Sequence, residues 1–225
     1  MNIQAIVRWL DERLQPEKFH DVANNGLQIA RSAADTARVA FAVDASVAAL
    51  ERAAQWGAGL CVVHHGISWG GGIRRLTGSE YAVVSTAIRR DLALYASHLP
   101  LDAHPELGNN AQLAKSLELT DLEPAFVYHG NTIGLIGRRR DGARIGVCSG
   151  GAGEFAVEAH ERGCVEYITG EASWGDVVAA ENVGMKMTCL GHYATETGGV
   201  RALAEAMAAE LAVETRFFAR PEVQS

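Results

Sequence analysis

The chain has 225 residues, 48% of them apolar and 21% charged, which is typical of a globular protein with a buried core. No apolar run approaches the ~20 residues that cross a bilayer, and the charged, amphipathic start predicts a first helix instead of a secretory signal. The net charge of −7, from 20 basic and 27 acidic residues, leaves no basic footprint for nucleic acid.

The four cysteines stand singly and form no CxxC pair, which argues against a zinc knuckle or a redox dithiol. Buried thiols in a reducing compartment are the better interpretation. We therefore predict a cytoplasmic protein that neither enters a membrane nor binds nucleic acid.

Short β-type runs alternate with helical patterns along the chain. The runs predict strands at residues 38–43, 60–63, 92–97, 132–137, 144–149, 165–169, 185–190 and 213–218. Apolar residues spaced by three or four, often closed by glycine, predict helices at 46–57, 79–90, 109–119, 153–163, 173–184 and 198–211. This alternation predicts an α/β fold made of two similar fused lobes, with mostly parallel sheets covered by helices.

The stretch 122–147 breaks the rhythm with a proline, an Asp-Gly turn and two adjacent β runs, and so predicts a hairpin that joins the lobes. We place the first lobe at 1–123 and the second at 124–225. Both halves show strand, helix, strand, helix, strand, and the third strand ends in histidine in each. The lobes are thus interpreted as related βαβαβ units, although any two α/β segments share this pattern.

The pair His64-His65 follows an apolar strand and precedes a glycine. Ligands of open α/β sheets bind at such carboxyl strand ends, and two neutral imidazoles suit metal coordination. Taken alone the pair is a weak signal, and a surface pair without a ligand explains it equally well.

The next predicted strand delivers His98 and Asp102 to the same edge, with Pro100 fixing the turn between them. A carboxylate beside histidines is the usual composition of a zinc, iron or manganese site. His98 is either a ligand or a donor behind the ligands, and we favour the second role. His104 lies past the turn and is interpreted as a loop residue.

A third strand end supplies His192 and Glu196, which share one face if a helical turn begins there. The HxxxE spacing alone is a weak signal, but three predicted strand ends should bring their His, Asp and Glu residues to one edge, and this convergence favours a metal site. Five ligands are too few for two closed four-coordinate sites, so Glu196 is the natural bridging carboxylate. Water would fill the open positions, as hydrolytic metal sites require.

Weaker candidates surround this set. Glu171 occupies roughly the place of His65 in the repeated half and either enters the same cleft or is an exposed charge. Trp69 and Trp174 follow strand ends and either wall the pocket or simply pack. The glycine-rich turn 148–153 resembles a phosphate cradle, but it lacks a P-loop lysine and the Rossmann spacing.

At these residues the sequence resembles the Nif-three-like dinuclear-metal family, in particular its short YbgI-type members, also known as GTP cyclohydrolase I type-2 homologues. The matching segments run in order from about residue 24 to 211: NNGLQI, VVHHGISWGG, HLPLDAHPELGNNAQLA, CSGGAGEFAVEA, YITGEAS and GHYATETGGVRALAEAM. Carried over by position, the resemblance implies metal ligands at His64, His65, Asp102, His192 and Glu196, with Glu196 as the bridge.

The resemblance further implies two divalent ions per chain (Zn, Fe or Mn), two α/β lobes, a toroidal homohexamer and metal centres facing its cavity. The chain departs from the wider family in HHG for HHP and in HLPLD before the aspartate, and the 120–143 stretch is shorter than in YbgI-type relatives. Any contribution that the longer stretch of the relatives makes to the rim of the pocket is therefore in doubt for this chain.

We predict a metal-dependent hydrolase of a small cyclic or phosphorylated compound, with His98 or Glu171 as proton-shuttle candidates. Opening of the purine ring of GTP is implied by the family's name alone. The alternative is a non-catalytic metal-binding scaffold or adaptor. The sequence selects neither the metal nor the substrate.

Overall fold

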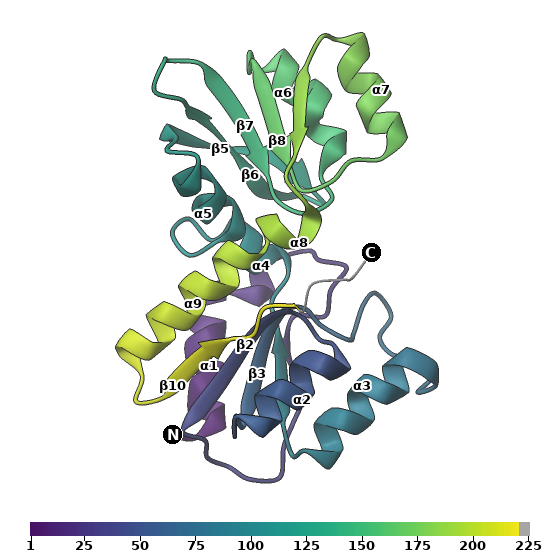
Figure 1. Cartoon of the computed structure of the whole chain (residues 1–225), viewed down its shortest axis with the longest axis vertical. Coiled ribbons are helices and arrows are strands. Elements are labelled where there is room, and N and C mark those ends of the chain that lie inside the picture. Colours follow the sequence, from purple (N-terminus) through teal and green to yellow (C-terminus); the bar gives the residue numbers. More distant parts are fainter. Residues whose placement is uncertain (221–225) are drawn as a thin grey trace. The chain divides into compact units, whose positions relative to one another are not determined.

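The computed structural model describes residues 1–220 and divides into two compact units, residues 1–101 with the segment from 200 onward, and residues 102–199. Each unit is built around its own five-stranded sheet. The predicted α/β fold with helix-covered sheets is thus confirmed (Figure 1). Within the described residues, no helix combines the length and apolarity needed to span a membrane.

The sheet of the first unit has the strand order β1-β4-β3-β2-β10. Its strands are β1 (Gly26–Ile29), β2 (Arg38–Asp44), β3 (Leu60–His65), β4 (Ala93–Ala96) and β10 (Glu214–Phe217). All neighbours pair in parallel except β1, which runs antiparallel to β4 at the edge. The central strands are buried on both faces, which explains why the sequence shows them as continuous apolar runs.

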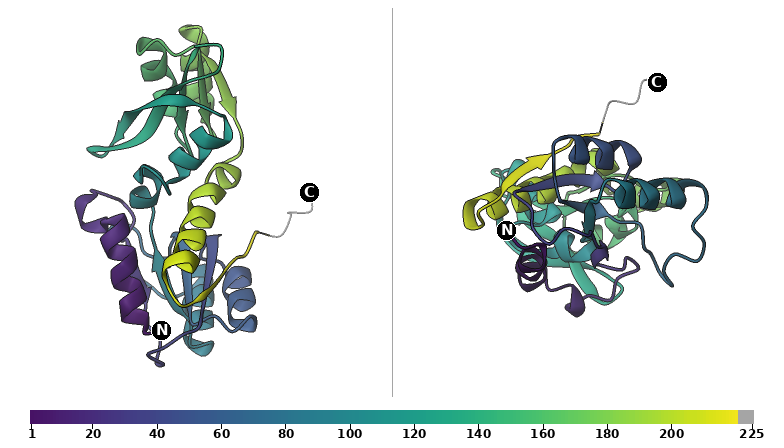
Figure 2. Two further views of the ribbon diagram at one scale, coloured as in Figure 1. Left: turned by 90° about the vertical axis from the view of Figure 1, so that its left-hand side faces the viewer. Right: turned by 90° about the horizontal axis from the view of Figure 1, so that it is seen from below.

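Helices cover both faces of this first sheet (Figure 2). The helices of the unit are α1 (Ile3–Leu14), α2 (Val47–Gln55), α3 (Gly78–Arg89) and the greater part of α9 (Thr197–Glu210). A short turn η1 (Pro16–Lys18) follows α1, and α4 (Leu99–Ala103) follows β4 and crosses the boundary into the second unit. Residues of α2 and α3 pack on one face with Ala40, Cys61 and Leu94. On the opposite face the Tyr95 hydroxyl donates to Asp11 of α1 at 2.8 Å.

The sheet of the second unit has the strand order β5-β6-β7-β8-β9. Its strands are β5 (Thr120–Tyr128), β6 (Asn131–Arg138), β7 (Arg144–Cys148), β8 (Glu166–Thr169) and β9 (Lys186–Cys189). The first three are antiparallel neighbours and the last three are parallel. Its helices are α5 (Asn109–Ser116), η2 (Gly153–Phe155), α6 (Ala156–Glu161), α7 (Trp174–Asn182) and α8 (His192–Thr195).

The β2-α2-β3-α3-β4 and β7-α6-β8-α7-β9 segments have the same order and the same parallel pairing, as the internal repeat predicted. The predicted hairpin exists as β6-β7, but it is no connection between lobes, because both strands lie inside the second sheet. The units also divide the chain differently from a boundary at residue 123. Asp102 belongs to the second unit, and the chain from residue 200 returns to the first, where β10 pairs with β2.

Candidate metal centre

Three histidines meet at the carboxyl ends of β3 and β4 in the first unit. His64 and His65 end β3, and His98 follows β4 by two residues. Each offers a ring nitrogen within 4.8 Å of the others, and the ring centroids lie 4.6 to 5.8 Å apart. The structure therefore brings His98 to the histidine pair, as the parallel pairing of β3 and β4 requires.

Each of these imidazoles is held by its Nδ1 atom. His64 Nδ1 lies 2.8 Å from the carbonyl oxygen of Ser97, His65 Nδ1 lies 2.9 Å from Asp44 Oδ1, and His98 Nδ1 lies 2.9 Å from Asp21 Oδ1. Because a carbonyl or carboxylate oxygen accepts, Nδ1 carries a proton, and in the neutral ring Nε2 then keeps the lone pair. Metal-ligating histidines are oriented in this way by the groups behind them.

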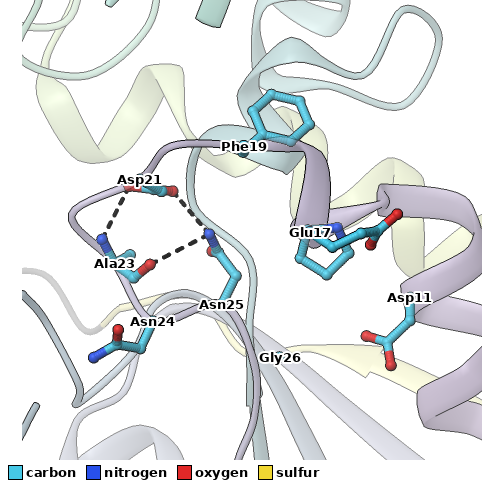
Figure 3. Close-up of a pocket in the computed structure, with 9 residues that line it drawn as sticks. Asp11, Glu17, Phe19, Asp21, Ala23, Asn24, Asn25 and Gly26 are labelled. Carbon is cyan, nitrogen blue, oxygen red and sulfur yellow. Dashed lines mark hydrogen bonds between the residues drawn. The ribbon is translucent and has the colours of Figure 1, made fainter. Parts of the chain in front are cut away.

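Asp21 lies in a loop before β1 and has a side chain that is only 2% exposed. Besides the His98 ring, its carboxylate accepts the Asn25 side-chain amide and the backbone N–H of Ala23, each at 2.9 Å (Figure 3). It also accepts the backbone N–H of Leu99 at 2.9 Å. Burial opposes ionisation of Asp21, but the hydrogen bonds and the nearby His98 outweigh it and lower its pKa to about 2. Asp21 is therefore a carboxylate at neutral pH.

The ligand candidates of the second unit gather at the ends of β8 and β9. His192 and Glu196 are one helical turn apart, with His192 Nε2 3.1 Å from Glu196 Oε1, so the predicted shared face is present. His192 Nδ1 lies 3.0 Å from Glu171 Oε1. The Glu196 side chain is 4% exposed and that of Glu171 is 63% exposed, so one carboxylate is enclosed and the other reaches solvent.

The glycine-rich turn after β7 packs directly against this cluster. Gly150 has a φ of +70°, and a Cβ there would lie 2.5 Å from Glu196 Oε1. Its N–H donates to Thr195 Oγ1 at 3.0 Å, which fixes the residue before Glu196. The turn therefore makes room for the glutamate and holds its helix, a role that the resemblance to a phosphate cradle did not predict.

Asp102 is held on the other side of the same turn. It is 7% exposed, accepts the Asn109 side-chain amide at 2.8 Å, and accepts the Ser149 hydroxyl at 3.3 Å. Burial first, and then the charge of Asp102, raise the pKa of Cys148 at the end of β7 well above its usual range, and Glu196 contributes to the same effect. Asp102 and Glu196 are therefore both close to the end of β7.

The predicted site residues thus fall into two sets. The first unit holds His64, His65 and His98, and the second holds Asp102, Glu171, His192 and Glu196. His104 closes a loop turn, as expected, with its Nδ1 accepting the backbone N–H groups of Glu106 and Leu107. Sequence reasoning missed Asp21, Asp44 and Asn109, and it gave the Ser149–Gly150 turn another role. The strand register would have given Asp44, because it pairs with His65.

The donor sets fit divalent metal ions. Imidazole nitrogens combined with carboxylate oxygens suit zinc, iron and manganese, and a cation compensates the charge of buried carboxylates such as Asp102 and Glu196. The anchored Nδ1 atoms supply the support that such ligands require.

His192 should titrate far above an ordinary histidine in the metal-free protein. The hydrogen bond to Glu196 first, and then that to Glu171, raise its pKa to about 9 against the opposing effect of burial. Because the pKa of His192 is higher in the folded protein than in the unfolded chain, its protonation stabilises the fold. This contribution to stability is complete below about pH 6.5 and is lost as the pH rises through 9. A ¹⁵N NMR titration of the metal-free protein measures the pKa of His192. Glu196→Gln should lower the midpoint of this titration. A midpoint near 6.5 in the unmodified protein contradicts the prediction of a raised pKa.

Fold and side chains together define a two-unit α/β protein with potential metal ligands at its strand ends. The chain belongs to the Duf34/NIF3 (NGG1p interacting factor 3) family, whose profile matches residues 1–142 and 135–222. It is 37% identical to the GTP cyclohydrolase 1 type 2 homolog of Halobacterium salinarum, over 98% of this chain and 99% of the relative. The protein of the same name from Deinococcus radiodurans is 39% identical, over 96% and 92% of the two chains.

Solved structures agree with this membership. The protein ybgI, whose function is described as unknown, matches with a TM-score of 0.90 and 30% identity over 99% of both chains. TTHA1606 from Thermus thermophilus matches with a TM-score of 0.82 and 28% identity, again over 99% of both. HcgD from Methanocaldococcus jannaschii has a TM-score of 0.85 at 20% identity, over 96% of this chain and 97% of HcgD, and so shares the fold.

Proposed function

We propose that the protein binds two divalent metal ions through His64, His65, Asp102, His192 and Glu196 and hydrolyses a small cyclic or phosphorylated compound. In this proposal the histidine pair of the first unit and the ligands of the second form one dinuclear centre, bridged by Glu196. Family membership supports this ligand set, since the chain matches the family profile over nearly its whole length.

The observation that carries the proposal is that the candidate ligands are held ready by other groups. His64 and His65 are each fixed through Nδ1, and Asp102 is fixed by Asn109. Holding several polar side chains in place costs conformational entropy, and burying the carboxylates costs solvation. Metal coordination is the chemistry that offsets both costs.

Divalent ions, when bound, supply Lewis acidity and lower the pKa of water. The chain itself supplies the proton-transfer groups. Glu171 is the better candidate, since its carboxylate lies 3.0 Å from His192 and is 63% exposed, so it can exchange protons with solvent. A general acid–base residue of this kind is worth about 10²–10⁴-fold in rate.

A cavity of about 550 Å³ in the first unit supports a small anionic substrate. Its lining includes Trp69, whose ring centroid lies 6.1 Å from that of His65, the two cations Arg74 and Arg75, and one carboxylate, Glu80. Both arginines are exposed, and neither forms an ion pair with any residue between 1 and 220. A guanidinium group can bind a phosphate through two parallel hydrogen bonds, and the indole of Trp69 offers a flat apolar surface on which a substrate ring can stack.

The test is a metal and substrate analysis of the purified full-length protein. After reloading with zinc, manganese or iron, elemental analysis should give about two ions per chain, as in two-metal hydrolytic sites. The substrates to screen are GTP, which the names of the two relatives contain, together with phosphoesters and cyclic amides. Glu171→Gln should lower turnover about 100-fold or more while keeping the ions.

Glu181→Gln is the matched control, because this carboxylate is exposed on α7 and away from the cluster. If the ions bind and no compound is consumed, and if their removal dissociates an assembly, the protein is a metal-stabilised scaffold and the hydrolase proposal is wrong. If no ion binds, both functions fail.

We also propose that the chain assembles into a homohexamer in the cytoplasm. The family resemblance supports the assembly, and the four free cysteines agree with a reducing compartment. Light scattering of the metal-loaded protein measures the mass directly, and a monomer at micromolar concentration contradicts the assembly.

A further inference from the structure

We infer that the outer edge of β10 is a contact surface at which two copies of the chain pair edge to edge, antiparallel about a twofold axis at Thr215. The sheets of the two first units then join into one continuous sheet. The inference rests on the proposed assembly and deepens it, because it names one surface through which the copies meet. It is independent of the metal centre.

The first argument is that β10 has a free side. It lies at the end of the strand order of the first sheet and pairs only with β2 (Figure 1). The N–H groups of Glu214 and Phe218 donate to carbonyl oxygens of β2 and of the residue before it. Because alternate residues of a strand point to opposite neighbours, the backbone groups of Thr215 and Phe217 point away from β2. Within residues 1–220, no backbone hydrogen bond joins these two residues to another segment.

The faces of β10 are covered, in contrast to its edge. On one face the Thr215 hydroxyl donates to the carbonyl oxygen of Ala204 in α9 at 3.0 Å, and the guanidinium of Arg201 lies 4.1 Å from the centroid of the Phe217 ring. On the other face, that of Arg216 lies 4.8 Å from the ring centroid of Trp56. The strand is therefore held in place from both sides and presents an ordered edge.

The second argument is that the sequence of this strand is complementary to itself. Residues 213–217 read Val-Glu-Thr-Arg-Phe, with an acidic residue before the central threonine and a basic one after it. In an antiparallel pair centred on Thr215, Glu214 faces the partner's Arg216, and symmetry makes this contact twice. Opposite charges directly across a strand pair stabilise it. The same register places the outward backbone groups of Thr215 in a hydrogen-bonded pair, so charge and backbone agree.

Both charges are available for such a contact. The Glu214 side chain is 66% exposed, although it lies 3.1 Å from Arg38 of β2. Arg216 is exposed and forms no ion pair with any residue between 1 and 220. Since a carboxylate has two oxygens, Glu214 can keep Arg38 and accept a second guanidinium.

The third argument is a comparison with the other edge strands. β1 has an irregular register between Leu27 and Ile29, and β5 has an irregular register and contains Pro124. β9 carries the exposed Lys186. Bulges, prolines and lysines are the features that keep sheet edges from pairing. β10 has neither proline nor lysine, and its register with β2 is regular over four residues.

The alternative is that the charges of β10 only keep its edge solvated, because exposed charges on a short strand also discourage pairing. The two explanations differ in how the mass of the protein responds to the signs of these charges. An edge that stays solvated makes no contact that a change of sign can break. A paired edge requires opposite signs at residues 214 and 216 of two copies.

The experiment measures the mass of the full-length protein by light scattering and sedimentation at micromolar concentration. Glu214→Arg and Arg216→Glu each place two like-charge pairs across the twofold axis, so each variant alone should have half the wild-type mass and dissociate at a concentration about 10-fold higher or more. An equimolar mixture of the two variants restores both opposite-charge pairs and should recover the wild-type mass. Mixing leaves the contacts within each chain unchanged, including that of residue 214 with Arg38, so a role in folding alone does not produce this recovery.

Glu12→Arg, the same charge change at an exposed position of α1, is the control and should keep the wild-type mass. Thr215→Pro removes an outward N–H without breaking the pairing with β2, and it should halve the mass as well. Melting curves establish that the variants are folded. Wild-type mass in the folded single variants, or no recovery in their mixture, overturns the inference and leaves the assembly and the metal site standing. A wild-type monomer overturns the inference together with the assembly, while elemental analysis still decides the metal proposal.

Discussion

Replacing Glu196 by glutamine should reduce the bound metal from about two ions per chain to about one. A neutral amide binds cations far more weakly than a carboxylate, and it offers a single oxygen, so it cannot bridge two ions. The loss should exceed about 100-fold in affinity for the weaker ion, since mutation of a group behind a ligand already costs 10–100-fold. Elemental analysis after dialysis against a weak chelator measures it.

Glu181→Gln, which also neutralises one carboxylate, should keep both ions. Retention of two ions by Glu196→Gln, with unchanged affinity, would remove Glu196 from the ligand set and end the bridging role proposed for it. The NMR spectrum of each metal-free variant shows whether it is folded.

Replacing Gly170 by alanine should destabilise the protein by about 3 kcal/mol, at the upper end for overpacking. A Cβ there would lie 2.6 Å from the Gly150 carbonyl oxygen and from Thr195 Oγ1, and 2.8 Å from His192 Cα. Two of these atoms are backbone and cannot rotate away. We expect the melting temperature to fall by about 6–12 °C and the metal content to fall with it.

The control is Gly175→Ala, where the nearest atom to a new Cβ is Ser173 Oγ at 3.6 Å and the backbone is helical. It should leave the melting temperature unchanged or raise it, because alanine favours helix by about 0.5–1 kcal/mol over glycine. Equal melting temperatures for the Gly170→Ala and wild-type proteins would mean that the end of β8 can shift, which the packing described here excludes.

The sequence was informative about the fold wherever burial was complete. The predicted strands at 38–43 and 60–63 correspond to β2 and β3, which are buried on both faces and so leave continuous apolar runs. β1 (Gly26–Ile29) was missed because it is a half-buried edge strand of four residues. β5 (Thr120–Tyr128) was missed because it contains Pro124 and mixes exposed with buried positions.

The residues of the candidate site also differ in how far the sequence revealed them. His64 and His65 in the first unit, and His192 and Glu196 in the second, were singled out because they follow predicted strands, and parallel strands bring their carboxyl ends to the same edge of each sheet. The groups that hold them are set by tertiary contacts that no local pattern reveals. Asp21 meets a residue 77 positions away, and Ser149 meets Asp102 from 47 positions away.

The path of the chain has a consequence for biogenesis. The second unit is one continuous stretch, 102–199, whereas the sheet of the first lacks its last strand until residues 214–217 have been made. On the ribosome the inserted unit can thus pair all its strands while β2 still has an open edge. The unit that carries His64 and His65 is therefore finished after the unit that carries Asp102 and Glu196.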